Sequence, residues 1–162
     1  MDLDDQAENP HNPAHMDPIT VSSYRDPAHR AEVIALWEAV FGYDTAHNKP
    51  ALVIDKKVAF GDDLFFVARC GGVVIGTVMA GYDGHRGWIY SVAVSPAHRR
   101  RGVGSQLVCF AERALADKGC VKVNLQIMES NQTVAAFYAS LGFSVEKRVS
   151  MGKPIDKNIP AA

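Results

Sequence analysis

The segment from Val92 to Gly104, VAVSPAHRRRGVG, joins an apolar run to a helix-like run through a short loop that combines charge with glycine. Gly102 and Gly104 let the backbone turn and approach a ligand closely. The helix that follows presents unpaired N–H groups and the positive end of its dipole, and three consecutive arginines add charge-assisted hydrogen bonds. This combination suits an anion such as a pyrophosphate. Taken alone, the arginines would favour a solvated basic turn.

Two familiar phosphate-binding motifs do not fit this loop. The pattern GxxxxGK[ST] is missing, because no Gly-Lys-Ser or Gly-Lys-Thr occurs in the chain. The pattern GxGxxG fails because Leu107 stands where the third glycine belongs. The loop instead resembles the acetyl-CoA loop of the GNAT N-acetyltransferase superfamily, whose pattern is Arg or Gln, two residues, Gly, one residue, and Gly or Ala. Arg99, Gly102 and Gly104 match it.

A second match follows in the expected order. The family's next strand and helix commonly read NxxAxxxYxxxGF, and this chain has Asn131, Tyr138, Gly142 and Phe143 in register, with Ala135 one place late. Residues 76–87, GTVMAGYDGHRG, are similar to small bacterial acetyltransferases of the YpeA type. The resemblance covers roughly residues 19–153 and is weak through residues 42–61.

The resemblance implies which residues hold acetyl-CoA as co-substrate. Backbone groups of Val92, Ala93 and Val94, at a splayed strand end, would bind the pantetheine arm, and a backbone N–H near Val94 would polarise the thioester carbonyl. Asn131 and Tyr138 would also face the co-substrate. The pyrophosphate would lie against the loop formed by Arg99, Arg100, Arg101, Gly102, Val103, Gly104 and Ser105.

Tyr138 is the predicted general acid. A phenol with a pKa of about 10 stays protonated at neutral pH and can donate to a thiolate whose conjugate acid has a pKa of about 8.5. Periodicity alone would have Tyr138 pack beside Phe137 and Leu141 on an amphipathic helix, but the motif favours the catalytic role. Asn131 is equally well suited to cap that helix, and both roles are compatible.

The general base stays open between several candidates. N-terminal acetyltransferases of the ribosomal-protein type carry Glu five residues before the helix Asn, where this chain has Gln126, which cannot take a proton. His85 and Asp83 rank slightly above Glu129, and a water chain to bulk solvent is the remaining route. The alternative for residues 82–87 is a polar hairpin turn around Asp83 and Gly84.

Periodicity and turn residues predict the elements that must position these groups. The expected order is β-α-β-β-β-α-β-α-β, an α/β (α+β) fold with a mixed, mostly antiparallel sheet and helices on both faces. The longest region without a pattern runs from Gly42 to Gly61. The predicted strands are residues 19–24, 64–70, 73–82, 88–94, 121–127 and 143–155, and the predicted helices are residues 28–41, 105–118 and 131–141.

Composition is that of one ordinary globular domain, with 162 residues and 48% hydrophobic content. Residues 1–18 hold five acids and no Lys or Arg, which predicts a disordered extension before a domain at 19–153, and residues 154–162 look like a loose tail. Removing those five acids from the 18 leaves 13 against 17 bases, a body charge of +4. This charge is too small to favour nucleic-acid binding, because no second basic stripe accompanies it.

Other function classes have little support. No apolar run approaches the length of a membrane span, no signal peptide is visible, and three cysteines without CxxC spacing fit a reducing cytoplasm. The six histidines are scattered and form no metal motif, so we expect no metal. The sequence therefore predicts an acetyl-CoA-dependent N-acetyltransferase acting on an amine of a small molecule or peptide. The alternative is a noncatalytic acyl-CoA binding or sensing module, and many relatives dimerise, for which an edge strand offers a route.

Overall fold

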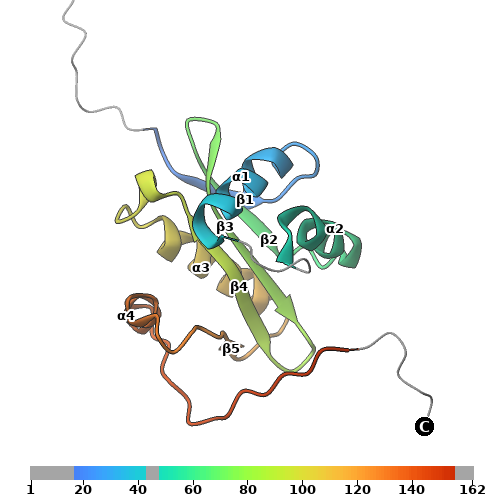
Figure 1. The fold of residues 1–162 in the computed structure, drawn as a ribbon, viewed down its shortest axis with the longest axis vertical. Helices are drawn as coiled ribbons and strands as arrows, with labels where there is room; N and C mark the ends of the chain where they lie inside the picture. The colour runs from blue at the N-terminus through green and yellow to red at the C-terminus, as the bar shows by residue number, and fades with distance from the viewer. Residues whose placement is uncertain (1–16, 43–47, 156–162) are drawn as a thin grey trace, which may run out of the picture. The chain divides into compact units, whose positions relative to one another are not determined.

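The computed structural model describes residues 17–42 and 48–155 (Figure 1). These residues form two compact units, and the boundary between the units along the chain lies between Gln126 and Ile127. The expectations for residues 1–16 and 156–162 lie outside the described residues. The first unit holds one sheet with the order β1-β2-β3-β4-β5, in which only the β4–β5 pair is parallel. Its strands are β1 (Thr20–Ser23), β2 (Phe65–Cys70), β3 (Val73–Tyr82), β4 (Gly87–Val94) and β5 (Val123–Asn124).

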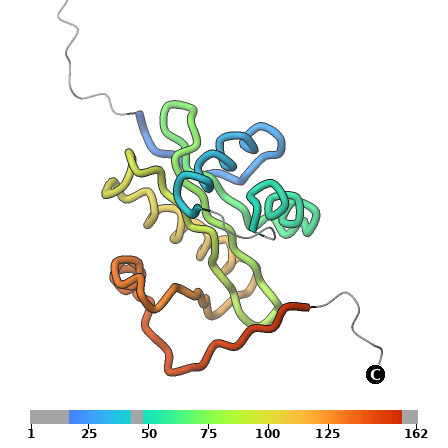
Figure 2. The backbone as a smooth tube through the Cα atoms, in the orientation of Figure 1, coloured from blue at the N-terminus to red at the C-terminus, as the bar shows by residue number. Residues whose placement is uncertain are grey.

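Three helices of the first unit accompany this sheet: α1 (Arg30–Phe41), α2 (Pro50–Phe60) and α3 (Val103–Asp117). A short 3-10 turn, Pro96–His98, lies between β4 and α3. Figure 2 traces the long β3–β4 hairpin and the continuous path from β4 through this turn into α3. The second unit contains α4 (Gln132–Ser140). The predicted helices α1, α3 and α4 and the predicted strands β2, β3 and β4 are confirmed.

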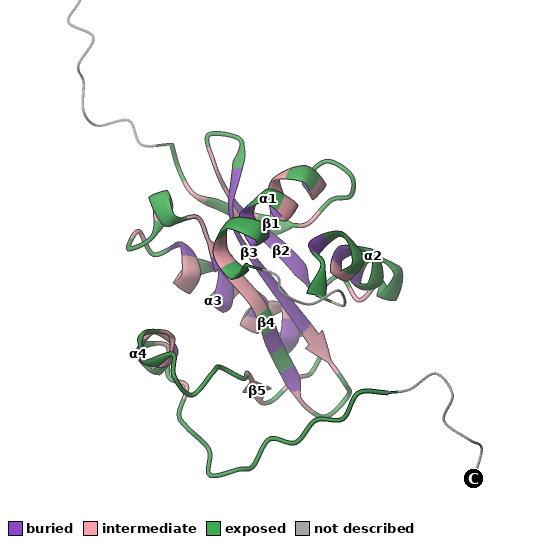
Figure 3. Ribbon diagram, in the orientation of Figure 1, coloured by how far each residue is buried: buried purple, intermediate pink, exposed green. Residues whose placement is uncertain are grey.

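Alternate residues of the strands pack against different helices. Phe65 and Val67 of β2 belong to the core that α1 and α2 form on one face, whereas Phe66 points to the other face and contacts Phe110 of α3, with ring centroids 4.9 Å apart. Because both faces are covered, β2 and β3 are buried along most of their length (Figure 3). The core on the α1 and α2 face consists of Val33, Leu36, Trp37, Ile54, Phe65, Val67, Val74, Met79 and Ala93.

Helix α2 was not predicted, and its buried face explains why. Pro50, Ile54 and Lys57 are the buried residues, at the i, i+4 and i+7 spacing of one helical face. A lysine in the third of these positions breaks the apolar pattern that periodicity needs. The end signals were present, since Pro50 opens the helix and Gly61, at φ 67°, closes it in the left-handed conformation.

The C-terminal strand predicted over residues 143–155 is wrong: no strand forms between Phe143 and Ile155. Val145, Val149 and Met151 are at least 87% exposed, so their alternation with polar residues reflects no buried face. The strand predicted over residues 121–127 shortens to Val123–Asn124. The assignment of residues 19–153 to a single domain stays a prediction.

Gly76 sets how closely α3 approaches the sheet, and it generates a stability prediction. A Cβ at this position would lie 2.9 Å from Cδ1 of Leu107 and 3.1 Å from Cγ1 of Val103, both on α3. We expect Gly76→Ala to lower the free energy of unfolding by about 1–3 kcal/mol through overpacking. Urea denaturation measures this. The matched control is Gly81→Ala in the same strand, where the nearest atom would be 3.6 Å away. Equal stability of the two variants would contradict the prediction.

Candidate active site

The central feature of the site is a β-bulge in β4. Thr77 of β3 lies opposite Ala93 of β4, and Met79 of β3 lies opposite Tyr90 of β4. The single residue between Thr77 and Met79 therefore faces two residues of β4, Ser91 and Val92. Ser91 adopts a φ of 52°, in the left-handed region that residues other than glycine seldom occupy. The bulge therefore needs contacts elsewhere to hold it.

Helix α1 provides those contacts through a buried threonine. The indole N–H of Trp37 donates to Oγ1 of Thr77 at 2.8 Å, and the Thr77 hydroxyl donates to the carbonyl of Ser91 at 3.1 Å. Trp37 and Thr77 are both completely buried. Since a buried donor or acceptor left unpaired costs about 1–3 kcal/mol, this chain of two hydrogen bonds favours the bulged form of β4.

The outer edge of β4 is open beyond the bulge. Within the described residues, β5 pairs with β4 only at Gly87 and Trp88, so the rest of β4 has no paired strand on that edge. The N–H of Ser95 donates to the carbonyl of Ile75 at 2.8 Å and ends the pairing with β3. The sheet is thus splayed where Val92, Ala93 and Val94 lie, and their main-chain groups line the opening.

The loop that follows ends in a helix with free N–H groups. Gly102 precedes α3 with a φ of 76°, and the first helical hydrogen bond runs from the N–H of Gln106 to the carbonyl of Gly102 at 3.0 Å. No side chain caps this end, so the first N–H groups of the helix, including those of the half-buried Gly104 and Ser105, have no side-chain partner at the positive end of the helix dipole.

The three arginines of the loop carry uncompensated charge. Arg99 and Arg100 are exposed and Arg101 is half-buried, and no carboxylate of the described part of the chain forms an ion pair with any of them. The Arg99 side chain donates only to the carbonyl of Val94, at 3.4 Å. The structure thus brings the predicted residues from Val92 to Ser105 together along one strand end, loop and helix start. Their binding role stays a prediction.

Tyr138 and Asn131 lie in the second unit. The side-chain oxygen of Asn131 accepts from the N–H of Val134 at 3.2 Å, which confirms its interpretation as the cap of α4. Tyr138 is 8% exposed and packs edge-on against Phe137 and Phe143, with ring centroids 5.0 and 5.6 Å apart. Burial raises the pKa of its phenol to about 12, so the hydroxyl stays protonated far above neutral pH.

Asp83 and His85 lie in the β3–β4 turn, away from the bulge. The Asp83 carboxylate accepts from the N–H groups of His85 at 2.8 Å and Arg86 at 2.6 Å, and these bonds hold its pKa below the usual range. Seven residue steps along β4, from Gly87 to Val94, span about 23 Å, so neither side chain reaches the strand end. The polar-turn interpretation of this segment fits the structure, and a role of Asp83 or His85 as general base stays a prediction.

Glu129 is an exposed residue of the second unit, in the turn that leads into α4. The main-chain carbonyl of Glu129 accepts from the side-chain amide of Gln132 at 2.8 Å, and the Glu129 carboxylate takes no part in that hydrogen bond.

A buried lysine that periodicity did not reveal lies between α2 and the sheet. The ammonium of Lys57 donates to Oδ2 of Asp62 at 2.6 Å, to the hydroxyl of Tyr90 at 3.1 Å and to the carbonyl of Ala80. It also lies 5.5 Å from the centroid of the Tyr90 ring. In the sequence, the signal that could have revealed Lys57 is its position on the face of α2 that becomes buried. Lys57 thereby joins that helix to β3 and β4 beside the bulge.

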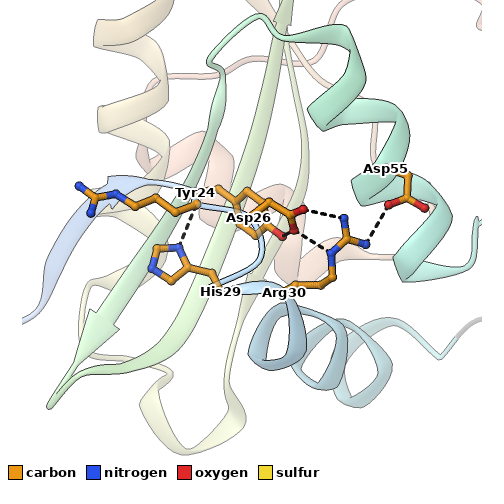
Figure 4. Close-up of polar contacts among 6 residues, drawn as sticks. Tyr24, Asp26, His29, Arg30 and Asp55 are labelled. Atoms are coloured by element: carbon orange, nitrogen blue, oxygen red, sulfur yellow. Dashed lines mark hydrogen bonds and ion pairs between the residues drawn. The ribbon is translucent and has the colours of Figure 1, made fainter.

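Helix α2 is also tied to α1 by a cluster of charges. Figure 4 shows Asp26 on one side of the Arg30 guanidinium and Asp55 of α2 on the other, at 2.7 and 2.8 Å. The Tyr24 hydroxyl donates to the same Asp26 carboxylate at 2.7 Å, and Nδ1 of His29 accepts from the N–H of Arg25. Exposed ion pairs of this kind contribute little stability each, and the shared guanidinium links α1 to α2 through Asp55.

The described residues contain neither a membrane-spanning helix nor a cluster of metal ligands. Across residues 17–42 and 48–155, no helix has the length and apolar character that a membrane span requires. Over the same residues, no three His, Cys, Asp or Glu side chains converge in a way that could hold a metal ion. Cys70, Cys109 and Cys120 are free thiols.

The bulged, open-edged β4 leads into a cationic glycine loop, and solved structures of acetyltransferases share this fold. An aminoglycoside N-acetyltransferase in complex with CoA aligns with a TM-score of 0.71 at 22% identity, covering 88% of this chain and 97% of that one. Glucosamine-6-phosphate N-acetyltransferase from Arabidopsis thaliana aligns with a TM-score of 0.64 at 24% identity, covering 86% and 100%.

Sequence comparison names the family. The model of the acetyltransferase (GNAT) family matches residues 25–143. An acetyltransferase from Yersinia pestis (strain Pestoides F) is 37% identical over 122 residues, which are 75% of this chain and 86% of that protein. One from Sodalis glossinidius is 38% identical over 118 residues, which are 73% and 82%. The chain therefore belongs to the GNAT family of acetyltransferases, as the two motifs indicated.

The hydrogen bonds of Thr77 generate a second prediction. Thr77→Val keeps the shape of the side chain but leaves the Trp37 indole N–H and the Ser91 carbonyl without their partner. We expect the free energy of unfolding to fall by about 1–3 kcal/mol in urea denaturation. Thr77→Ser is the control, because it retains the hydroxyl and should recover part of the loss. A valine variant as stable as the wild type would show that these bonds do not hold the bulge.

Proposed function

We propose that the protein transfers an acetyl group from acetyl-CoA to a primary amine of a small molecule or peptide by direct attack of the amine. One observation carries this proposal: an open strand edge at a bulge leads directly into a loop with three arginines that form no ion pair in the described residues, followed by a helix start that no side chain caps. Membership of the acetyltransferase family supports the same reaction class.

The donor set fits the chemistry of coenzyme A. Its pyrophosphate is an anion, and the N–H groups of Val103, Gly104 and Ser105 offer neutral donors at the positive end of a helix. Arg99 to Arg101 add charge that no carboxylate in the described residues neutralises. The extended arm of coenzyme A carries amides, which suit the unpaired main-chain edge of Val92 to Val94. Acetyl-CoA, when bound, supplies an activated thioester.

The proposed step is balanced as follows. The amine nitrogen forms a bond to the acetyl carbon, the bond from that carbon to sulfur breaks, and a backbone N–H near Val94 stabilises the negative charge on the carbonyl oxygen. The extra proton of the amine leaves to water, directly or through Glu129. Tyr138 donates its proton to the departing thiolate, and the phenolate then takes up a proton from water, which replaces the one that the amine released. Its pKa of about 12 keeps the phenol protonated at neutral pH.

Binding of acetyl-CoA tests the first half of the proposal. Calorimetric titration should show micromolar affinity, and the double change Arg99→Ala and Arg101→Ala should weaken it at least about tenfold, because charge-assisted hydrogen bonds to the pyrophosphate are lost. Arg113→Ala is the matched control, an exposed arginine further along α3. A wild-type protein that does not bind acetyl-CoA would overturn the proposal.

Turnover tests the second half. Tyr138→Phe removes the proton donor but keeps the ring, so kcat should fall about 100-fold while the Kd of acetyl-CoA is unchanged. Because burial disfavours the phenolate, kcat of the wild type should show no loss from Tyr138 ionisation below about pH 11. Thiol release over pH 7–11 measures both. An unchanged kcat in Tyr138→Phe would remove this residue from the mechanism.

A further inference from the structure

We propose that the cavity between α2 and the β3–β4 hairpin is the acceptor site, and that it selects a primary amine with one positive charge and an aromatic or other flat apolar body. The inference rests on the proposed function, because it names the substrate class of that same reaction. The cavity has a volume of about 570 Å³, within the range of small-molecule sites, and every residue that lines it belongs to the first unit.

The inner end of the cavity adjoins the bulge. Met79 and Tyr90 both line it, and they are the last register pair of β3 and β4 before the chain bulges at Ser91 and Val92. Trp88 and Tyr90 alternate with inward residues and share the face of the sheet that α2 covers. An amine held against this face therefore lies beside the strand segment to which we assign the thioester.

Three exposed aromatic side chains give the cavity its character. Phe60 at the end of α2 is 73% exposed, Trp88 is 39% exposed and Tyr90 is 42% exposed, and all three line the same hollow. Single exposed aromatic residues scattered over a surface are common, whereas several that gather in one hollow are typical of a ligand site. Flat rings offer stacking to an aromatic body and attraction to one ammonium group.

The charges in the cavity argue against an acceptor with several ammonium groups. Of its two carboxylates, Asp62 pairs with Lys57 at 2.6 Å and accepts from the N–H of Leu64 at 3.2 Å, whereas Asp83 accepts only from N–H groups, those of its own turn and the Trp88 indole. Lys56 and Lys57 add two positive charges to the lining. Within the described residues, a polyamine or aminoglycoside would find only Asp83 without an ion pair among these carboxylates, and the Lys56 ammonium would repel its further charges.

The cavity wall is also held in place before any ligand binds. Lys57 donates to side-chain or main-chain oxygens on three different segments, namely Asp62, Ala80 and Tyr90. The tyrosine hydroxyl donates onward to the carbonyl of Ala80 at 3.3 Å. The Tyr90 ring thus has a fixed position, which favours shape selection over adaptive binding.

Substrate preference tests the inference. We expect acetyl transfer from acetyl-CoA, followed by thiol release, to show a kcat/KM for 2-phenylethylamine at least about tenfold above that for n-butylamine or spermidine. Phe60→Ala should raise the KM for 2-phenylethylamine about tenfold and leave the KM for acetyl-CoA unchanged. Val58→Ala is the matched control, because Val58 is 44% exposed on the same helix and does not line the cavity. A preference for spermidine, or equal KM values for the two variants, would overturn the inference.

Fluorescence gives a readout that does not need catalysis. The chain has two tryptophans, and Trp37 is completely buried, so a change in emission on adding 2-phenylethylamine reports on Trp88. The change should saturate in the wild type and in Val58→Ala and weaken about tenfold in Phe60→Ala. No saturable change in the wild type would contradict the inference.

The two readouts distinguish the inference from the proposed function. Binding that depends on Phe60, without acetylation of any amine, would overturn the proposed function and keep the cavity as an amine site. Acetylation of amines that is indifferent to Phe60→Ala would overturn the inference and keep the proposed function.

Discussion

The hydroxyl of Thr77 is the interaction on which the geometry of the site depends most directly. It accepts from Trp37 at 2.8 Å and donates to Ser91 at 3.1 Å, so one buried group links a helix to the carbonyl of a strained residue. Ser91 would otherwise relax toward regular strand pairing, since its φ of 52° is disfavoured for a side chain with a Cβ. Regular pairing would shift every later residue of β4 to the opposite face and redirect the main chain that leads into the loop.

In the reaction that we propose, strand β4 serves both the co-substrate and the acceptor. Before the bulge, Trp88 and Tyr90 face the cavity under α2, and after it Ala93 joins the core on that face although it is an odd number of residues away. The bulge absorbs the extra residue and lets the open edge and the cavity coexist on neighbouring segments. Co-substrate and acceptor can then approach the same few residues from different directions, which direct transfer without a covalent enzyme intermediate requires.

Sequence reasoning succeeded where local patterns decide the structure. Apolar periodicity and turn residues predicted α1, α3, β2 and β3, and Asn131, as a suitable cap, indicated the start of α4. The failures have one cause, which is dependence on distant partners. Trp37 and Thr77 are 40 residues apart, so their bond leaves no local signal. Val145 and Val149 alternate like a strand, yet alternation without a pairing partner makes none. The residue types of Asp83 and His85 likewise do not reveal how far from the strand end they lie, because the topology of the β3–β4 hairpin sets that distance.

Lys57 links the missed helix to the unexpected cavity. A buried ammonium is expensive to desolvate, and an apolar residue of similar volume would cover the same surface without that cost. An apolar residue such as methionine could not hold Asp62, Ala80 and Tyr90 around one atom, as the Lys57 ammonium does. The same residue that hides α2 from periodicity therefore orders the wall of the cavity, as expected where a local rule is broken at a site of function.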